Sequence, residues 1–301
     1  MAIAKGKEST EGVGYKRYIG VAPCFVKAVN PTKAELEMLL NTQLEKDPEY
    51  TSEVDDDNGN KINTARITFV VQPDIDKTGI ETGPITVTLW LRKQFRYNKE
   101  KTKVQVIDKY GRTAWVTSEE LKTHAIPQYS NGPANLDPDY RPCYVGEEDL
   151  TNFLIAYLNI PRVMKYNQNE KKWYMVDNPQ DSECRLDHIE DYFKGDFSEL
   201  QECATFQPQN KVKILFGVKT NDQGQLHQAV FTQMFLRNSV NDYNILDAAV
   251  KERKENGAYG TTEFEIDSFR EYTVKETDFT ETSADPFSQP AGATPSPWDN
   301  V

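Results

Sequence analysis

The sequence has few of the residues and motifs from which enzyme sites are built. Its 301 residues include three histidines and four cysteines, and no two cysteines form a CxxC pair. The phosphate-binding pattern GxxxxGK(S/T), the nucleophile pattern GxSxG and the zinc-protease pattern HExxH are all missing. These absences argue against ATPase, serine hydrolase and zinc-protease chemistry, so we expect no enzymatic activity and no cofactor.

Long apolar segments are also missing. No run of about 18 apolar residues occurs, which argues against a membrane-spanning helix and a membrane partner. The N-terminal segment MAIAKGKESTEG has no apolar core, so it does not predict a signal peptide, and we expect residues 1–14 to form a flexible arm. These features favour a cytoplasmic protein whose cysteines are reduced.

Three residues, Cys184, His188 and Cys203, are the candidate metal ligands. Cys184 and His188 are four residues apart, so on a helix they would share one face, as a pair of zinc ligands does. The neighbouring sequence offers no fourth ligand. The alternative, which we favour, is that all three are ordinary core and surface positions.

Positive charge is scarce overall but concentrated in one segment. The chain has a formal net charge of -12, yet residues 88–117 carry eight cationic side chains against two acidic ones. The cations are Arg92, Lys93, Arg96, Lys99, Lys101, Lys103, Lys109 and Arg112, and the aromatic residues among them are Trp90, Phe95, Tyr97, Tyr110 and Trp115. Interleaved cations and aromatic rings predict a groove for single-stranded nucleic acid. The alternative is a two-stranded sheet with a solvated charged face.

Strands dominate the elements that the sequence predicts. Alternating or β-branched segments predict strands at 18–29, 64–71, 84–96, 103–106, 113–116, 211–218, 226–236 and 261–275, and a hairpin at 166–176. Helical spacing and capping patterns predict helices at 32–47, 117–124, 147–158, 182–193 and 242–255, and loops are expected at 53–60 and 127–146. The pattern favours a mainly β protein with inserted helices (α+β), in which residues 15–275 form an OB-like β-barrel with helical decoration.

Alternation in the strand at 84–96 sorts its side chains between two faces. Ile85, Val87, Leu89 and Leu91 share one face, whereas Thr86, Thr88, Trp90 and Arg92 share the other. The same parity assigns Phe95 to the core. The predicted nucleic-acid contacts are Trp90, Arg92, Lys93, Arg96, Tyr97, Lys101, Lys103, Tyr110, Arg112 and Trp115, with Tyr129, Tyr140 and Arg141 as second-rank candidates.

The C-terminal segment 276–301 differs in composition from the rest of the chain. It contains five acidic residues, four prolines and no lysine or arginine, which predicts a disordered acidic tail. Such a tail could occupy the basic groove until DNA displaces it and frees its apolar tip for a partner, or it could simply increase solubility. The candidate partner-binding residues are Asp285, Phe287, Trp298 and Asp299.

Several phrases of the sequence resemble the single-stranded DNA-binding proteins of tailed phages, particularly the crAss-like phages. They are YIGVAP (18–23), AVNPTKAELE (28–37), TKVQVIDKYGRTAWVT (102–117), YSNGPANLDPDYRP (129–142), HIEDYFKGDF (188–197) and AGATPSPWDNV (291–301). The resemblance covers about residues 15–275 and the tail.

The resemblance implies a non-enzymatic OB-fold protein in the cytoplasm of an infected bacterium. Such a protein coats exposed strands during phage DNA replication, recombination and repair, and recruits phage or host replication proteins through its tail. The tail departs from the usual bacterial pattern, because the acidic-Pro-Phe tip at Asp285–Phe287 lies 14 residues before the end. The alternative function is a structural or assembly role in the phage virion.

Overall fold

The protein is described by a computed structural model. It covers residues 16–56, 59–125, 136–159, 162–167, 172–177, 186–201, 209–221 and 224–273, with only the backbone at 162–167 and 172–177. The chain divides into two units, Met1–Glu271 and Tyr272–Val301, and all the elements belong to the first. The predicted arm and the tail at 276–301 lie outside the described residues.

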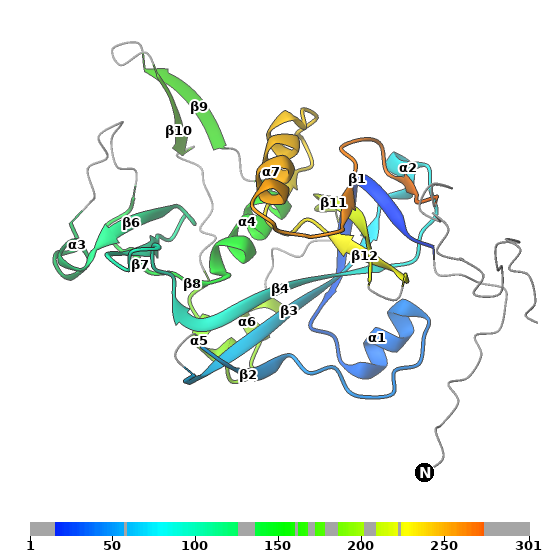
Figure 1. Ribbon diagram of the computed structural model, residues 1–301, viewed down its shortest axis with the longest axis horizontal. Coiled ribbons are helices and arrows are strands. Elements are labelled where there is room, and N and C mark those ends of the chain that lie inside the picture. Colours follow the sequence, from blue (N-terminus) through cyan, green and yellow to red (C-terminus); the bar gives the residue numbers. More distant parts are fainter. Residues whose placement is uncertain are drawn as a thin grey trace, which may run out of the picture. The chain divides into compact units, whose positions relative to one another are not determined.

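A curled, antiparallel half-barrel sheet of ten strands forms the centre of the fold (Figure 1). Its main path runs through β12 (Leu226–Val230), β11 (Val212–Thr220), β1 (Tyr18–Val29), β3 (Lys61–Pro73), β4 (Ile85–Phe95) and β8 (Tyr144–Val145). Four short strands pair beside this path: β2 (Thr51–Asp55), β13 (Leu236–Arg237), β14 (Glu263–Phe264) and β15 (Arg270–Glu271). The prediction of a mainly β fold with inserted helices is confirmed.

Two smaller sheets complete the β structure. One consists of β5 (Lys103–Ile107), β6 (Thr113–Thr117) and β7 (Arg141–Pro142), and the other is the hairpin of β9 (Arg162–Asn167) and β10 (Lys172–Asp177). The first has its own apolar cluster, in which Val104, Val106, Ala114, Val116, Leu136 and Tyr140 are buried. A bridge between Tyr97 and Val104 connects it to the end of β4.

Seven helices, all short, are present in the described part of the chain. They are α1 (Lys33–Leu40), α2 (Ile75–Thr78), α3 (Ser118–Thr123), α4 (Glu147–Tyr157), α5 (Ile189–Tyr192), α6 (Ser198–Gln201) and α7 (Asn244–Glu255). The capping boxes of α1 and α3, at Thr32–Glu35 and Thr117–Glu120, form as the sequence predicts. No helix among these residues is long and apolar enough to cross a membrane.

The two faces of the main sheet have different coverings. The inner face packs on α4, α5 and α6 in one large apolar cluster, in which the Phe153 ring of α4 stacks on Phe69 of β3 at 4.1 Å between centroids. The outer face is covered by α7 over β1 and β11, where Leu246 and Val250 pack with Val21. Further along the sheet, the outer side chains of β4 reach solvent.

Several predicted boundaries differ from the structure. The expected acidic loop at 53–60 begins as strand β2, because 51–55 pair with 61–65 of β3. The strand predicted at 226–236 ends at Val230, after which Phe231 and Phe235 enter two different apolar clusters. In place of the strand predicted at 261–275, the described residues form only the two-residue strands β14 and β15. A strand of two residues is too short to be recognised from alternation in the sequence.

Two further segments differ in a similar way. The helix predicted at 182–193 is confined, within the residues that are described, to the four residues of α5. The predicted irregular loop at 127–146 contains β7 and β8, which pair with β5 and β4. Both strands are two residues long, so their pairing depends on distant strands and not on a local pattern.

Candidate nucleic-acid interface

Strand β4 presents two different faces, as its alternation predicts. Val87, Leu89 and Leu91 are buried on the inner face. Trp90 is 55% exposed on the outer face, and Arg92 beside it is also exposed. The outer face of β4 therefore places a large aromatic ring and a cation in solvent, next to each other.

Arg66 of β3 completes this surface. It pairs with Trp90 in the register of β3 and β4, so the two side chains share the outer face. The Arg66 guanidinium carbon lies 5.9 Å from the centroid of Trp90 and 5.5 Å from that of Tyr50, so the cation sits between two aromatic rings. We call Tyr50, Arg66, Trp90 and Arg92 the outer patch.

Arg66 is the functional candidate that the sequence prediction missed. Its Nε atom is buried without a hydrogen-bond partner, and no carboxylate in the described ranges forms an ion pair with it. The signal was present in the segment TARITFVV, where Arg66 alternates with the apolar residues Ile67 and Phe69. Arg66 lies outside residues 88–117, so it is not among the cations of that segment.

Four of the eight cations in 88–117 are neutralised locally. Lys93 pairs with Glu190 at 2.9 Å, Lys109 with Asp137 at 3.4 Å, Arg112 with Asp108 at 2.5 Å, and Arg96 with Glu148. Over the part of the chain that is described, Arg92, Lys99, Lys101 and Lys103 form no ion pair, and all four are exposed. Fewer cations are therefore free to bind a ligand than the sequence alone indicates. Three of the free ones, Lys99, Lys101 and Lys103, lie in or beside the turn between β4 and β5.

Arg96 and Trp115 belong to a junction with helix α4. The Arg96 guanidinium lies 5.9 Å from the Trp115 ring centroid and forms an ion pair with Glu148 at the start of α4. Glu148 also accepts hydrogen bonds from Gln105 Nε2 at 3.1 Å and Thr113 Oγ1 at 3.2 Å. This network holds β5 and β6 against α4. Arg96 and Trp115, both predicted to contact nucleic acid, therefore contribute to the fold, and both remain partly exposed.

Tyr110 and Arg112 stabilise the turn between β5 and β6. The carboxylate of Asp108 is fully buried and accepts hydrogen bonds from the backbone amides of Tyr110 and Arg112, at 2.9 and 3.0 Å. The Arg112 guanidinium lies 4.7 Å from the Tyr110 ring centroid. Only 19% of the Arg112 side chain is exposed, which leaves little of it for a ligand.

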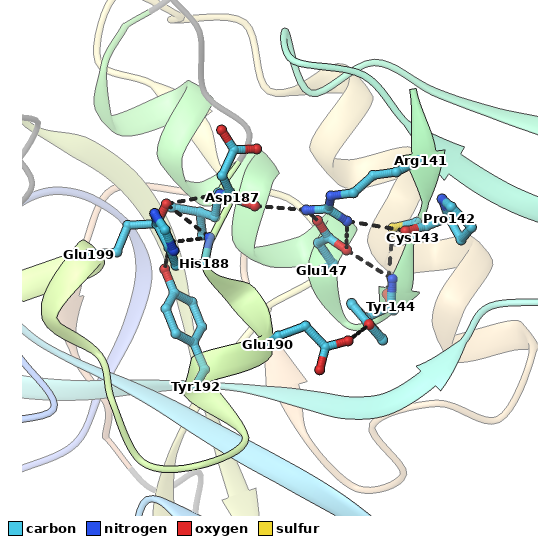
Figure 2. Close-up of polar contacts among 11 residues, drawn as sticks. Arg141, Pro142, Cys143, Tyr144, Glu147, Asp187, His188, Glu190, Tyr192 and Glu199 are labelled. Carbon is cyan, nitrogen blue, oxygen red and sulfur yellow. Dashed lines mark hydrogen bonds and ion pairs between the residues drawn. The ribbon is translucent and has the colours of Figure 1, made fainter. Parts of the chain in front are cut away.

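The second-rank candidates Tyr140 and Arg141 both have partners within the fold. Tyr140 is buried in the cluster of the small sheet, and its hydroxyl donates to the backbone oxygens of Glu120 and Ala125 at 3.0 and 2.8 Å. Arg141 donates to both carboxylate oxygens of Glu147, at 3.0 and 2.6 Å, as Figure 2 shows. These contacts hold both side chains in the fold and leave little of either for a base or a phosphate. The third such candidate, Tyr129, lies outside the described residues.

Phe95 lies on the predicted face but not in the core. Its ring packs on Tyr144 at 5.0 Å between centroids, on the inner side of the sheet, yet the residue is 38% exposed. The reason is that β4 extends past its pairing with β3 at Arg92, and only the two-residue β8 pairs with it there. Tyr97, just beyond, is 49% exposed, so two aromatic residues reach solvent at this end of β4.

Gly146 connects the outer patch to helix α4. It lies between β8 and α4 with φ of +90°, a backbone conformation that favours glycine. A Cβ atom at this position would overlap the Trp90 carbonyl oxygen. The absence of a side chain at Gly146 is therefore what allows α4 to begin against the backbone of Trp90.

Asp149, in the first turn of α4, is a half-buried carboxyl group with a shifted pKa. Burial, followed by the nearby Glu148 carboxylate, raises the pKa of Asp149 to about 6, although Arg96 and Arg253 act in the opposite direction. A carboxyl pKa that is higher in the folded state reduces the stability of the fold as pH rises from about 4 to about 6.

Asp149→Asn is therefore expected to stabilise the fold at pH 7 by about 1–3 kcal/mol, and to have little effect at pH 4, where the native carboxyl is protonated. Thermal unfolding of both proteins between pH 4 and pH 8 measures this difference. Glu255→Gln, at an exposed position on α7, is the charge-matched control and should show no such pH dependence. An equal difference between Asp149→Asn and the native chain at pH 4 and pH 7 would contradict the expectation.

The predicted metal ligands are only partly described. His188 is exposed, and its Nδ1 lies 3.8 Å from Asp191 Oδ2. Cys184 and Cys203 lie outside the described residues, as do Asp285, Phe287, Trp298 and Asp299 of the tail. Among the residues with described side chains, no group of three or more histidine, cysteine, aspartate or glutamate residues is arranged to hold a metal ion.

Comparison of this chain with protein-family models, with curated proteins and with solved structures gave no match. The functional assignment therefore depends on the chemistry of the outer patch and on the phrases of the sequence.

Proposed function

We propose that this protein binds single-stranded DNA during phage DNA replication, recombination and repair, through an OB-like barrel whose outer face carries the binding site. One observation supports the proposal most directly. The exposed Trp90 has Arg66 opposite it on β3 and Arg92 two residues further along β4, and neither cation forms an ion pair with the described carboxylates.

The physical argument begins with the exposed tryptophan. Exposing more than half of a Trp side chain leaves apolar surface in water, which a stacked base would cover. Every base has a flat π face, so stacking on Trp90 tolerates any sequence and contributes roughly 1–3 kcal/mol per base. Arg66 is already held between Tyr50 and Trp90, so little side-chain entropy is lost when it binds a phosphate.

Phosphate contacts would extend from the outer patch along β4. Arg92 is exposed beside Trp90, and Lys99, Lys101 and Lys103 follow in the β4–β5 hairpin with Tyr97 close by. Cations and rings that alternate in this way fit a strand whose backbone and bases must be contacted in turn. The net charge of -12 disfavours polyanion contacts over most of the surface, so binding depends on local groups of cations such as this one.

A titration of labelled oligo(dT) at two salt concentrations tests the proposal. With about four or five phosphates neutralised, log K should fall with log salt at a slope of roughly -3, since each contact on a single strand contributes about -0.7. Duplex DNA of equal length is the control and should bind more weakly, because its bases cannot stack on Trp90. If oligo(dT) does not bind even at low salt, the proposal is wrong, and the chain should then be sought in purified virions.

Deleting residues 276–301 is expected to tighten oligo(dT) binding at low salt. The segment has five acidic residues and no cation, so it can compete with DNA for the basic residues of the groove. The effect should shrink as salt rises, because salt screens the competition. Equal affinities of the full and shortened chains at low salt would show that the tail does not compete.

A further inference from the structure

A polar pocket lies on the outer face of the main sheet, away from the outer patch. It has a volume of about 490 Å³ and is bordered by β1, β11, α2 and the start of α7. The residues that give it its chemistry are Lys77, Lys213, Asn238, Asn241, Tyr243 and Ser268. This volume is in the range of small-molecule sites.

Lys213 is the central residue of the pocket. It pairs with Pro23 of β1, which directs its side chain to the outer face, and it is 7% exposed. Its ammonium donates to the Val240 carbonyl and to Asn241 Oδ1, the latter at 3.0 Å, and lies 5.4 Å from the Tyr243 ring centroid. Both acceptors are neutral.

A buried ammonium without an acidic partner is unusual. Lysine is rarely buried unless it is paired, because removing its charge from water is costly. No carboxylate in the described ranges forms an ion pair with Lys213. The ammonium has three donors, and two have the neutral acceptors named above, which leaves both a donor and a full positive charge for a ligand.

The other lining residues add donors of the same kind. Lys77 is exposed and forms no ion pair with the described carboxylates, and neither Asn238 nor Ser268 uses its side chain in a hydrogen bond with a described residue. Helix α7 begins at Asn244, next to the pocket, and its N-cap Tyr243 provides no side-chain cap. Asp267 is the single acid among the described lining residues, so the cations outnumber it.

We infer that this pocket binds a phosphate group carried by a nucleotide. Lys213 and Lys77 would contact the phosphate oxygens, and Asn238, Asn241 and Ser268 would donate hydrogen bonds to the same group. The phosphate could belong to a free nucleotide or to a DNA strand that continues across the sheet from Trp90. This site goes beyond the proposed function, because a nucleotide could bind here even if Trp90 binds no DNA.

Isothermal titration of the full chain with dTMP, thymidine and inorganic phosphate tests the inference. We expect dTMP to bind and thymidine not to bind. Lys213→Met should weaken dTMP binding at least tenfold, and Lys77→Ala by several-fold. Lys254→Ala, at an exposed lysine of α7 outside the pocket lining, is the matched control and should leave dTMP binding unchanged.

Two further arms separate the sources of the phosphate. If inorganic phosphate competes with dTMP, the pocket recognises free phosphate groups. If oligo(dT) binds and dTMP does not, Lys213→Met should weaken oligo(dT) binding and reduce the slope of its salt dependence by about 0.7. This result would show that the pocket binds a phosphate of the DNA strand. No binding of dTMP and no effect of Lys213→Met on oligo(dT) would overturn the inference. If Lys213→Met does not fold, the same titrations are made with Lys77→Ala and Ser268→Ala. Weaker binding by these variants would support the inference, and unchanged binding by both would contradict it.

Discussion

Trp90→Ala is expected to weaken oligo(dT) binding by about 5- to 150-fold, which is the equivalent of the roughly 1–3 kcal/mol that one stacked base contributes. The loss should be mainly independent of salt, because stacking involves no release of counterions. Fluorescence titration at two salt concentrations measures both the affinity and its slope. Trp90→Phe, which keeps a flat ring, should retain most of the binding.

Two controls make this result specific to the outer patch. Ile245→Ala removes an apolar side chain that is 72% exposed on α7, more than Trp90 itself, and should leave the affinity unchanged. Arg66→Ala should weaken binding and lower the salt slope, and its effect should not add to that of Trp90→Ala, because the two side chains are in contact. An affinity of Trp90→Ala equal to that of the native chain would remove the outer patch from the binding site.

Glu147→Ala is expected to lower the free energy of unfolding by about 3–5 kcal/mol, since it leaves the Arg141 guanidinium inside the protein without its partner. Glu147 is fully buried and accepts both hydrogen bonds from Arg141 together with one from the Tyr144 amide at 2.9 Å. Arg141 also donates to the Leu186 carbonyl at 2.7 Å, so the loss would loosen the contact between β7, α4 and the segment before α5.

Urea unfolding of the native chain and of Glu147→Ala measures this difference. The control is Asp247→Ala, which breaks the exposed pair between Asp247 and Lys251 on α7 and should cost less than about 0.5 kcal/mol. If the two variants differ from the native chain by the same small amount, the buried ion pair does not hold these elements together.

Where a pattern is local, the sequence predicts this structure well. Strand β1 has the predicted ends, Tyr18 and Val29, although its pairing with β3 shifts register between Val26 and Ala28. The exposure of Trp90 and Arg92 followed from strand parity alone. The capping box at Thr32–Glu35 places the start of α1, because both partners lie within one turn.

Where a contact joins distant parts of the chain, the sequence could not reveal it. Lys93 and Arg96 counted as free cations until the fold brought Glu190 and Glu148 to them from 97 and 52 residues away. Tyr140 and Arg141 lay in a stretch without periodicity, which gave no sign that one is buried and the other paired. Arg66 was missed because its neighbours come from other parts of the chain, Tyr50 from just before β2 and Trp90 from β4.

Gly146 shows how the position of an aromatic ring can depend on a residue that never touches a ligand. Its surroundings leave no space for even one carbon beyond the backbone, although the residue is partly exposed. Surface exposure would normally mark such a position as free to vary during evolution. At Gly146 any side chain would have to displace the backbone of Trp90, so a substitution there would alter the surface around the Trp90 ring.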